Sequence, residues 1–300
     1  MARMNANAAP RDSFATLLLS SSFVVIWASG FIVARLAAPH GDPFTFLSFR
    51  YGLSILVFVI ASAAIGASWP RDWASWRDAL IAGILLHGLY IGGVFWAIWH
   101  GLPAGVTALV TGLHPLITAA LAIPLLREHV NSRQWMGIAM GFVGVGLVVA
   151  PALAVAKDLS LAPFLVSLGA TFALSLGTVW QKRSRPQMDL RVNAAMQFIG
   201  ALLIAAPLAL LAESGRFDAT PQIWGALLWA VFVISVGAIS LLLVLLKRGA
   251  ASRVAPLLYV APPVAALIAY FMFDEKLAAI QVAGMALAIA GAYMARHTRL

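Results

Sequence analysis

Hydrogen-bonding side chains recur at helical spacing inside long apolar segments of this chain. Two sets of four are spaced by three or four residues, so that a helix would place each set on one face. The sets are Thr107, Thr111, His114 and Thr118, and Ser167, Thr171, Ser175 and Thr178. Such stripes could form the wall of a binding site, although a single Ser or Thr in a membrane helix usually bonds to its own helical turn.

Prolines near the middle of two apolar segments should interrupt the backbone hydrogen bonding there. Pro115 and Pro262–Pro263 remove amide donors and push away the carbonyls four residues earlier. The carbonyls of Thr111, Leu258 and Tyr259 then need other partners, because an unsatisfied carbonyl in lipid is costly. We therefore expect these helices to face protein or a wet cavity at that depth, unless the Thr111 hydroxyl or a neighbouring helix satisfies the kink.

Arg50 is the one full charge that falls well inside an apolar segment. It could reach outward to the lipid headgroups or attract a substrate carboxylate within the protein. Gln197, which lies 147 residues later, is also polar. No Asp or Glu lies deep in a segment, which disfavours polyamine and quaternary-cation substrates, and a single interior arginine disfavours phosphorylated sugars and nucleotide sugars.

Aromatic side chains and a second histidine could offer flat surfaces to a ligand. Aromatic stacking adds on the order of 0.5–1.5 kcal/mol beyond area burial, which is about tenfold in affinity at most. Tryptophans near segment ends are alternatively typical of the belt at the membrane interface. The predicted substrate-binding residues are His87, Tyr90, Trp96, Thr107, Thr111, His114, Pro115, Ser175, Thr178, Trp180, Gln197, Tyr259, Pro262 and Arg50.

These side chains lie on segments whose length fits a lipid bilayer. The chain of 300 residues is 62% hydrophobic and 10% charged, far from the balance of soluble domains. Apolar runs of about 20 residues, enough to cross the hydrocarbon core, recur without the alternation of a barrel strand. We predict ten spanning helices, at 14–37, 43–66, 78–99, 103–126, 132–150, 161–181, 190–212, 222–246, 252–273 and 277–295. The sequence therefore predicts an all-α polytopic membrane protein.

Lys and Arg are distributed unevenly between alternate polar breaks. Fifteen lie on one side, at positions 3, 11, 71, 77, 127, 133, 182, 183, 185, 191, 247, 248, 253, 296 and 299. Four lie on the other side, at positions 35, 157, 216 and 276. Because cytoplasmic loops carry the excess of Lys and Arg, both termini are predicted to be cytoplasmic. The same distribution accounts for the net charge of +9 without a nucleic-acid partner.

Residues 30–144 repeat at 177–291 with a constant offset of 147 and no gap. Matching pairs include Gly30 and Gly177, Pro39 and Pro186, Asp42 and Asp189, Pro115 and Pro262, and Gly144 and Gly291. Each half holds five predicted spans, an odd number, so the halves must enter the membrane from opposite sides. Two inverted repeats are typical of secondary transporters, whose substrate path runs between them.

Small residues form a stripe near the end of each half. The stripes consist of Gly137, Gly141 and Gly144, and of Gly284, Ala288 and Gly291. Stripes of this kind allow close helix contact, either within the monomer or at a dimer interface.

The same regions carry a doubled signature, made of Glu128, Gln134, Gly137 and Gly144, then Glu275, Gln281, Gly284 and Gly291. It resembles that of the EamA family in the drug/metabolite transporter superfamily, and the resemblance covers residues 14–295. The resemblance implies a ten-helix exporter whose central cavity is lined by the first, third, fourth, sixth, eighth and ninth helices, with the fifth and tenth as peripheral supports. Within the family, the chain resembles the YddG-type exporters of aromatic and other neutral amino acids.

We therefore expect an inner-membrane exporter, not an enzyme, that moves small neutral or zwitterionic metabolites by alternating access. Its expected partners are the bilayer and a small-molecule substrate, first of all neutral amino acids including aromatic ones, with no cofactor, metal or nucleic acid and with a monomer favoured. The expected organisation is a cytoplasmic tail at 1–13, repeats at 14–150 and 161–295, and a tail at 296–300. The alternatives are export of another small metabolite or drug, and an intramembrane enzyme, for which no H-E-x-x-H or nucleophile-elbow motif is present.

Overall fold

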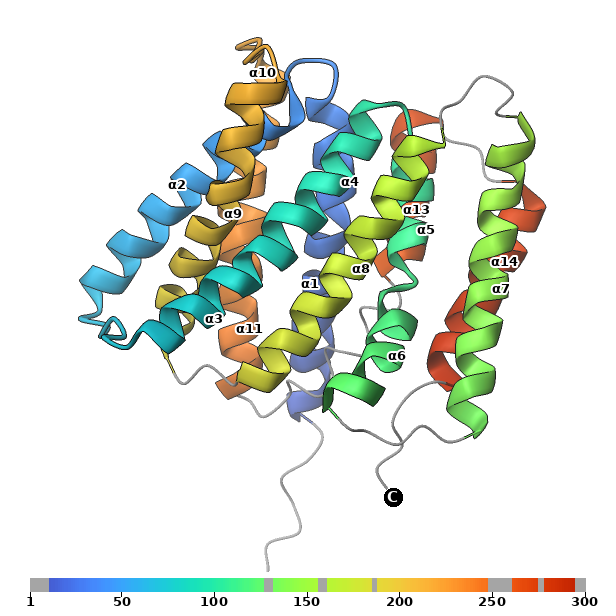
Figure 1. The fold of residues 1–300 in the computed structure, drawn as a ribbon, viewed down its shortest axis with the longest axis horizontal. Coiled ribbons are helices and arrows are strands. Elements are labelled where there is room, and N and C mark those ends of the chain that lie inside the picture. Colours follow the sequence, from blue (N-terminus) through green and yellow to red (C-terminus); the bar gives the residue numbers. More distant parts are fainter. Residues whose placement is uncertain are drawn as a thin grey trace, which may run out of the picture.

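Helices make up nearly all of the chain that the computed structural model describes, namely residues 11–126, 132–155, 161–184, 188–247, 261–274 and 278–294. They stand side by side in a bundle (Figure 1). No strand occurs within these ranges, and an isolated antiparallel bridge joins Gly41 to Phe217. The prediction of an all-α chain is confirmed.

Both halves contain a similar order of α-helices with one π-helical segment each. The first half contains α1 (Arg11–Ala37), α2 (Pro43–Ala64), α3 (Trp73–Gly83), the π-helical segment η1 (Ile84–Leu89), α4 (Tyr90–Trp99), α5 (Ala104–Thr111), α6 (His114–Leu126) and α7 (Ser132–Val155). The second contains α8 (Ala162–Ser184), α9 (Leu190–Ala212), α10 (Pro221–Leu228), the π-helical segment η2 (Trp229–Gly237), α11 (Ala238–Lys247), α13 (Ala261–Phe273) and α14 (Ala279–Met294).

Six helical stretches are long and apolar enough to cross a bilayer, namely 43–64, 73–99, 104–121, 162–184, 190–212 and 221–241. Shorter apolar helices cover 21–37, 135–144, 264–273 and 279–291. Large apolar side chains also lie on the outside of the bundle, where Leu210, Leu211 and Phe271 are 83%, 86% and 75% exposed. Lipid is the solvent that such a surface requires, and the architecture is that of a multi-pass membrane protein.

The offset of 147 seen in the sequence is kept in the positions of the helices. The pairs α2 and α9, α6 and α13, and α7 and α14 each begin 147 residues apart. The π-helical segments η1 and η2 occupy corresponding stretches of the two halves as well. The two halves are therefore built on the same sequence of elements.

The predicted segment 103–126 contains a break that divides it into two helices. Helix α5 ends at Thr111, and α6 begins at His114 after Gly112 and Leu113. Pro115 is consequently the second residue of α6. A proline is tolerated there because its missing N–H has no partner in the first turn of a helix.

The helix that contains the predicted segment 78–99 begins before that segment, at Trp73. The side chain of Asp72 accepts a hydrogen bond from the Ser75 amide at 2.7 Å and caps α3, which starts at Trp73. This hydrogen bond lowers the pKa of Asp72. A polar first turn with its own cap is not visible to a search for apolar runs.

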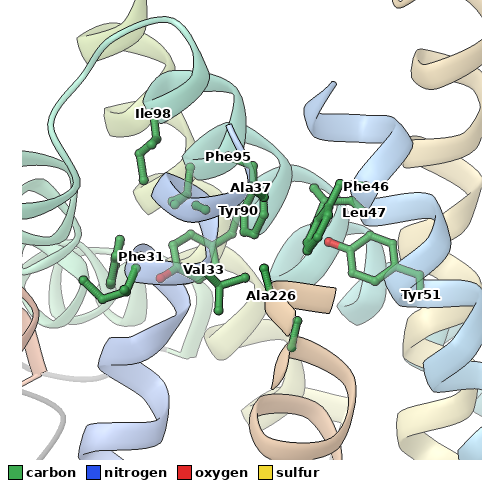
Figure 2. Packing of buried hydrophobic residues seen from close by; sticks show 14 of the residues in the cluster. Phe31, Val33, Ala37, Phe46, Leu47, Tyr51, Tyr90, Phe95, Ile98 and Ala226 are labelled. Carbon is green, nitrogen blue, oxygen red and sulfur yellow. The ribbon is translucent and has the colours of Figure 1, made fainter. Parts of the chain in front are cut away.

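The core is made where α1, α2, α4, α9 and α10 meet (Figure 2). Tyr51 and Leu47 of α2 are fully buried, and the rings of Phe46 and Phe95 stack with centroids 5.6 Å apart. Lipid is as apolar as these side chains, so the bundle owes its stability to close packing and to hydrogen bonds between helices.

Helices α7 and α14 pack mainly against each other at one side of the bundle (Figure 1). A Cβ added at Gly144 would lie 2.5 Å from the carbonyl oxygen of Gly284, and one at Gly291 would lie 2.5 Å from that of Gly137. The two stripes of small residues therefore face each other within the chain. Of the two roles left open by the sequence, they serve packing inside the monomer.

Two carboxylates fasten the turn before α2 to the turn after α9. Glu213 accepts hydrogen bonds from the amides of Phe44 and Thr45, at 2.8 and 2.7 Å, and from Thr45 Oγ1 at 2.9 Å. In return Asp42 accepts from the amide and hydroxyl of Ser214 and from the amide of Arg216. Glu213 thus satisfies the free amides at the N-terminus of a helix in the other half. We call this set the inter-repeat clasp.

Candidate functional site

His114, the first residue of α6, is held to α8 by two hydrogen bonds. Its Nε2 lies 3.0 Å from Thr178 Oγ1, and its carbonyl accepts from Ser175 Oγ at 3.1 Å. The single proton of Thr178 is directed to the Leu174 carbonyl at 2.8 Å. Thr178 Oγ1 must therefore accept from His114, so the Nε2 atom carries the ring proton and Nδ1 is the acceptor nitrogen of a neutral ring.

The hydroxyls of the two polar stripes mostly bond to carbonyls four residues earlier. Thr107 donates to Pro103, Thr111 to Thr107, and Thr171 to Ser167, at 2.9, 3.1 and 2.9 Å. Ser175 shares its proton between the Thr171 and His114 carbonyls. This is the common behaviour of such residues in membrane helices. Where the proton is occupied in this way, the hydroxyl oxygen offers lone pairs as an acceptor. The hydroxyls of Thr118 and Ser167, in the same stripes, have no partner among the described residues.

Tyr90 lies between the polar stripe of α5 and the apolar core. It is the first residue of α4, is 6% exposed, and its hydroxyl lies within hydrogen-bonding reach of the Thr111 side chain. Figure 2 shows its ring close to Val33 and Phe31 of α1. Among the described residues, the Thr111 carbonyl has no backbone donor, since the residue four positions later is Pro115. Tyr90, Thr111 and His114 thus lie around the break between α5 and α6.

Arg50, His87 and Gln197 form a second polar group, where α2, η1 and α9 meet. Arg50 is 3% and Gln197 6% exposed. The Gln197 side chain is within hydrogen-bonding reach of the His87 ring, and the Arg50 charge is close enough to act on that ring. At this low exposure Arg50 does not reach outward, and its attraction of a substrate carboxylate stays a prediction.

The π-helical segment η1 positions His87, and this element was missed in the sequence. The amide of Tyr90 bonds to the Leu85 carbonyl, five residues earlier, and the Tyr51 hydroxyl donates to the His87 carbonyl at 2.8 Å. A π turn widens the helix and is frequent at functional sites. Hydrophobic periodicity does not reveal such a turn, because the apolar run continues through it.

Trp96 and Trp180 do not lie together. The Trp96 ring packs on His100 at the end of α4, with centroids 3.6 Å apart. The Trp180 Nε1 donates to the Asp78 carbonyl at the start of the same long helix, 3.2 Å away. Eighteen residues of helix separate Asp78 from Trp96, or about 27 Å. One small ligand cannot contact both tryptophans.

For two predicted site residues, Tyr259 and Pro262, the structure describes no side-chain contacts. Tyr259 lies outside the described residues, as does Leu258. Pro262 is the second residue of α13, in the position that Pro115 has in α6. Both prolines thus stand at the second position of a helix, although the sequence placed them in helix interiors.

An all-helical, multi-pass membrane protein with an internal repeat and buried polar groups around a broken helix is the architecture of a transporter. The chain belongs to the EamA-like transporter family, whose pattern matches residues 14–150 and again 161–296. The family is the one that the doubled Glu, Gln and Gly signature indicated.

Relatives over nearly the full length are transporters too. The chain is 27% identical to a probable amino-acid metabolite efflux pump of Salmonella typhimurium, with 95% of this chain and 94% of that protein covered. A probable amino-acid metabolite efflux pump of Escherichia coli is 24% identical, with 92% and 93% covered. A solved crystal structure matches with a TM-score of 0.66 at 21% identity, covering 94% of this chain and 96% of its own, and supports the fold alone.

Proposed function

We propose that this protein exports small neutral or zwitterionic amino acids across the inner membrane by alternating access. The proposal includes ten spanning helices in two inverted sets of five, a central cavity, and cytoplasmic termini. Its support is the uneven distribution of Lys and Arg and the offset of 147 shared by sequence and helix positions. The names of the two relatives point to the same class of substrate.

The observation that carries the substrate class is the acceptor surface around the break between α5 and α6. Its hydroxyl protons are directed to carbonyls, and His114 is a neutral ring pinned to Thr178. An ammonium group is recognised by lone pairs of this kind, together with the free Thr111 carbonyl. In this proposal Thr107, Thr111, His114, Ser175 and Thr178 contact the substrate.

The charges in the described part of the spans agree with a substrate of no net charge. Asp42, Asp72, Asp189 and Glu213 lie next to helix ends, and Asp78 lies in the second turn of α3. No acidic side chain of the described residues stands near the middle of a span, where a polyamine or a quaternary cation would need one. This leaves the neutral and zwitterionic amino acids as the substrates that fit best.

The aromatic residues favour large apolar side chains without excluding small ones. Tyr90 is placed to contribute a ring near Thr111, and a stacking gain of about 0.5–1.5 kcal/mol corresponds to about tenfold at most. We therefore expect Phe, Trp, Leu and Met to be moved ahead of Gly, and Lys, Glu and sugar phosphates to be excluded.

Counterflow into proteoliposomes tests this proposal. Vesicles preloaded with each of the common amino acids, at equal internal and external pH, should exchange labelled leucine when the internal solute is a neutral amino acid. Vesicles loaded with a polyamine or a phosphosugar should not. Faster exchange with either of those two than with any neutral amino acid would show that the substrate belongs to another class of small metabolite or drug. Conversion of the labelled solute to a product would indicate an intramembrane enzyme.

A further inference from the structure

We propose that Arg50, His87 and Gln197 form a binding site for a small monovalent anion where α2, η1 and α9 meet. The anion is either a free halide or the carboxylate of a transported amino acid, and only the second source rests on the proposed function. The site is built from α2, η1 and α9, whereas His114 begins α6 and bonds to Thr178 of α8.

The first argument is a buried cation without a partner. Arg50 is 3% exposed, and its Nε has no hydrogen-bond acceptor in the described structure. The ion pairs in the described chain are more exposed, as in Arg77 with Asp78, whose side chains are 51% and 22% exposed. A guanidinium stays protonated at every relevant pH, and a buried charge is strongly unfavourable unless an opposite charge compensates it. A bound anion would supply that charge.

The second argument is the set of donors beside this cation. His87 Nδ1 is buried and has no partner among the described residues, and Gln197 lies within reach of the same ring. Ser54, one turn from Arg50 on the same face of α2, is fully buried with an unpartnered Oγ. A ring N–H, an amide and a hydroxyl beside a guanidinium together provide the donors that coordinate a halide or a carboxylate.

The surroundings limit the size and charge of the ligand. The Phe198 ring lies 4.8 Å from the His87 ring, and Tyr51 and Phe58 both stack on Phe198. Within the described residues Arg50 is the sole cation with its charge inside this seam. A phosphate or sulfate would need further cations, so the site fits an ion with one negative charge.

The position of the site links the two halves of the chain. Tyr51 and Phe198 occupy corresponding positions of the repeat and stack on each other, with centroids 5.8 Å apart. In the inverted arrangement of the proposed function, residues related by the two-fold axis meet only where that axis passes, so the axis would run close to this pair. Arg50 and Gln197 precede them and also correspond. An anion here is therefore held by both halves at once.

Thermal unfolding of the full-length protein in detergent tests the site without any transport assay. Sodium chloride, bromide or acetate is titrated against sodium sulfate at equal ionic strength. The melting temperature of the wild type should rise with the monovalent anions and saturate, since a ligand that binds the folded state stabilises it. Arg50→Gln should lose the saturable rise, and in sulfate it should melt no lower than the wild type, because the uncompensated charge is gone. Arg77→Gln, at an exposed pair, should respond like the wild type.

Two further variants keep the test decisive if Arg50→Gln does not fold. Gln197→Leu and His87→Leu retain the guanidinium and remove one donor each. Each should raise the half-saturating anion concentration by about tenfold or more, the loss expected for one charge-assisted hydrogen bond. No saturable rise in the wild type, or the same response in the wild type and these variants, would overturn the site.

Competition identifies the source of the anion. If leucine shifts the bromide titration and leucinamide does not, the site binds the substrate carboxylate. If neither amino compound competes, the site binds a free halide. A saturable anion response in a protein that moves no amino acid would leave this site standing and remove the proposed function, whereas amino-acid transport without any anion response would do the reverse.

Discussion

At the scale of single residues, His114 acts through one proton whose position follows from its partner. Thr178 donates its own proton to the Leu174 carbonyl, so the His114 ring must donate to Thr178 Oγ1. This bond fixes the ring between α6 and α8 and leaves Nδ1 as an acceptor. A neutral donor and acceptor at one residue suits recognition of a zwitterion better than a permanent charge does.

Substitution of His114 separates hydrogen bonding from packing. His114→Gln can still donate to Thr178 and should keep substantial transport, whereas His114→Leu leaves Thr178 Oγ1 without its donor and should lose most of it. The loss of one hydrogen bond amounts to about 0.5–1.5 kcal/mol, or up to about tenfold. Initial rates of leucine counterflow, normalised to protein in the vesicles, measure the difference. Equal rates for both variants would remove His114 from the site.

The sequence predicts which residue types stand at the candidate site, but it does not predict which hydrogen bonds their side chains make. The spacing of Thr107 and Thr111 fits the helix α5 that carries both, whereas His114 begins the next helix, α6, so a single wall formed by all three stays a prediction. Whether a hydroxyl bonds to its own turn depends on rotamers, and whether Arg50 reaches lipid or is enclosed depends on α9, far away in sequence. Neither is contained in local spacing.

At the scale of elements, the contact between α7 and α14 depends on two glycines. A Cβ at Gly144 would lie 2.5 Å from backbone atoms of α14, whereas one at Gly146 would meet nothing within 4 Å. Gly144→Ala should therefore lower stability by about 1–3 kcal/mol through overpacking. Gly146→Ala is the matched control and should be neutral or stabilising by up to about 1 kcal/mol, because glycine weakens a helix. Melting temperatures in detergent should separate the two, and equal values would contradict this packing.

The inter-repeat clasp makes a second prediction at this scale. Glu213→Ala leaves the amides of Phe44 and Thr45 without their acceptor and should cost about 1–3 kcal/mol of stability. Glu213→Gln retains one acceptor oxygen and should cost less. Chemical unfolding of the purified variants is the measurement.

An exposed pair in the same turn provides the control for the clasp. Arg216 donates a hydrogen bond to Asp218 and lowers the pKa of that carboxyl, so the pair remains charged at neutral pH. Because both side chains are exposed, solvent screens the pair and Asp218→Asn should leave stability close to that of the wild type. If Asp218→Asn cost as much as Glu213→Ala, the clasp would have no special role.

The starts of the helices are more predictable than their internal breaks. Predicted spans begin at 43, 132 and 190, as α2, α7 and α9 do, because Pro43 and polar neighbours mark these starts in the sequence. The π turns of η1 and η2 and the gap between α5 and α6 were not predicted as such. They depend on contacts such as that of Tyr51 with the His87 carbonyl, which join residues far apart in the chain.

At the scale of the whole molecule, the two halves keep one template and differ in chemistry. Corresponding helices begin at the same offset, while Arg50 corresponds to Gln197, and His114 to Ala261. The two halves therefore share the positions of their helices and differ in the polar residues that those helices carry. A carrier needs related inward-open and outward-open forms, which inverted repeats provide, and a binding surface near the boundary between them.

The claim most at stake is that the halves lie in opposite orientations, and accessibility of single cysteines tests it directly. The chain has no cysteine, so each introduced thiol is unique. In intact cells an impermeant thiol reagent should label Ser160→Cys, between the two repeats in the sequence, and should not label Ser132→Cys or Ser184→Cys unless the membrane is opened. Labelling of Ser184→Cys from outside, with Ser160→Cys protected, would contradict the inverted arrangement and the alternating-access mechanism built on it.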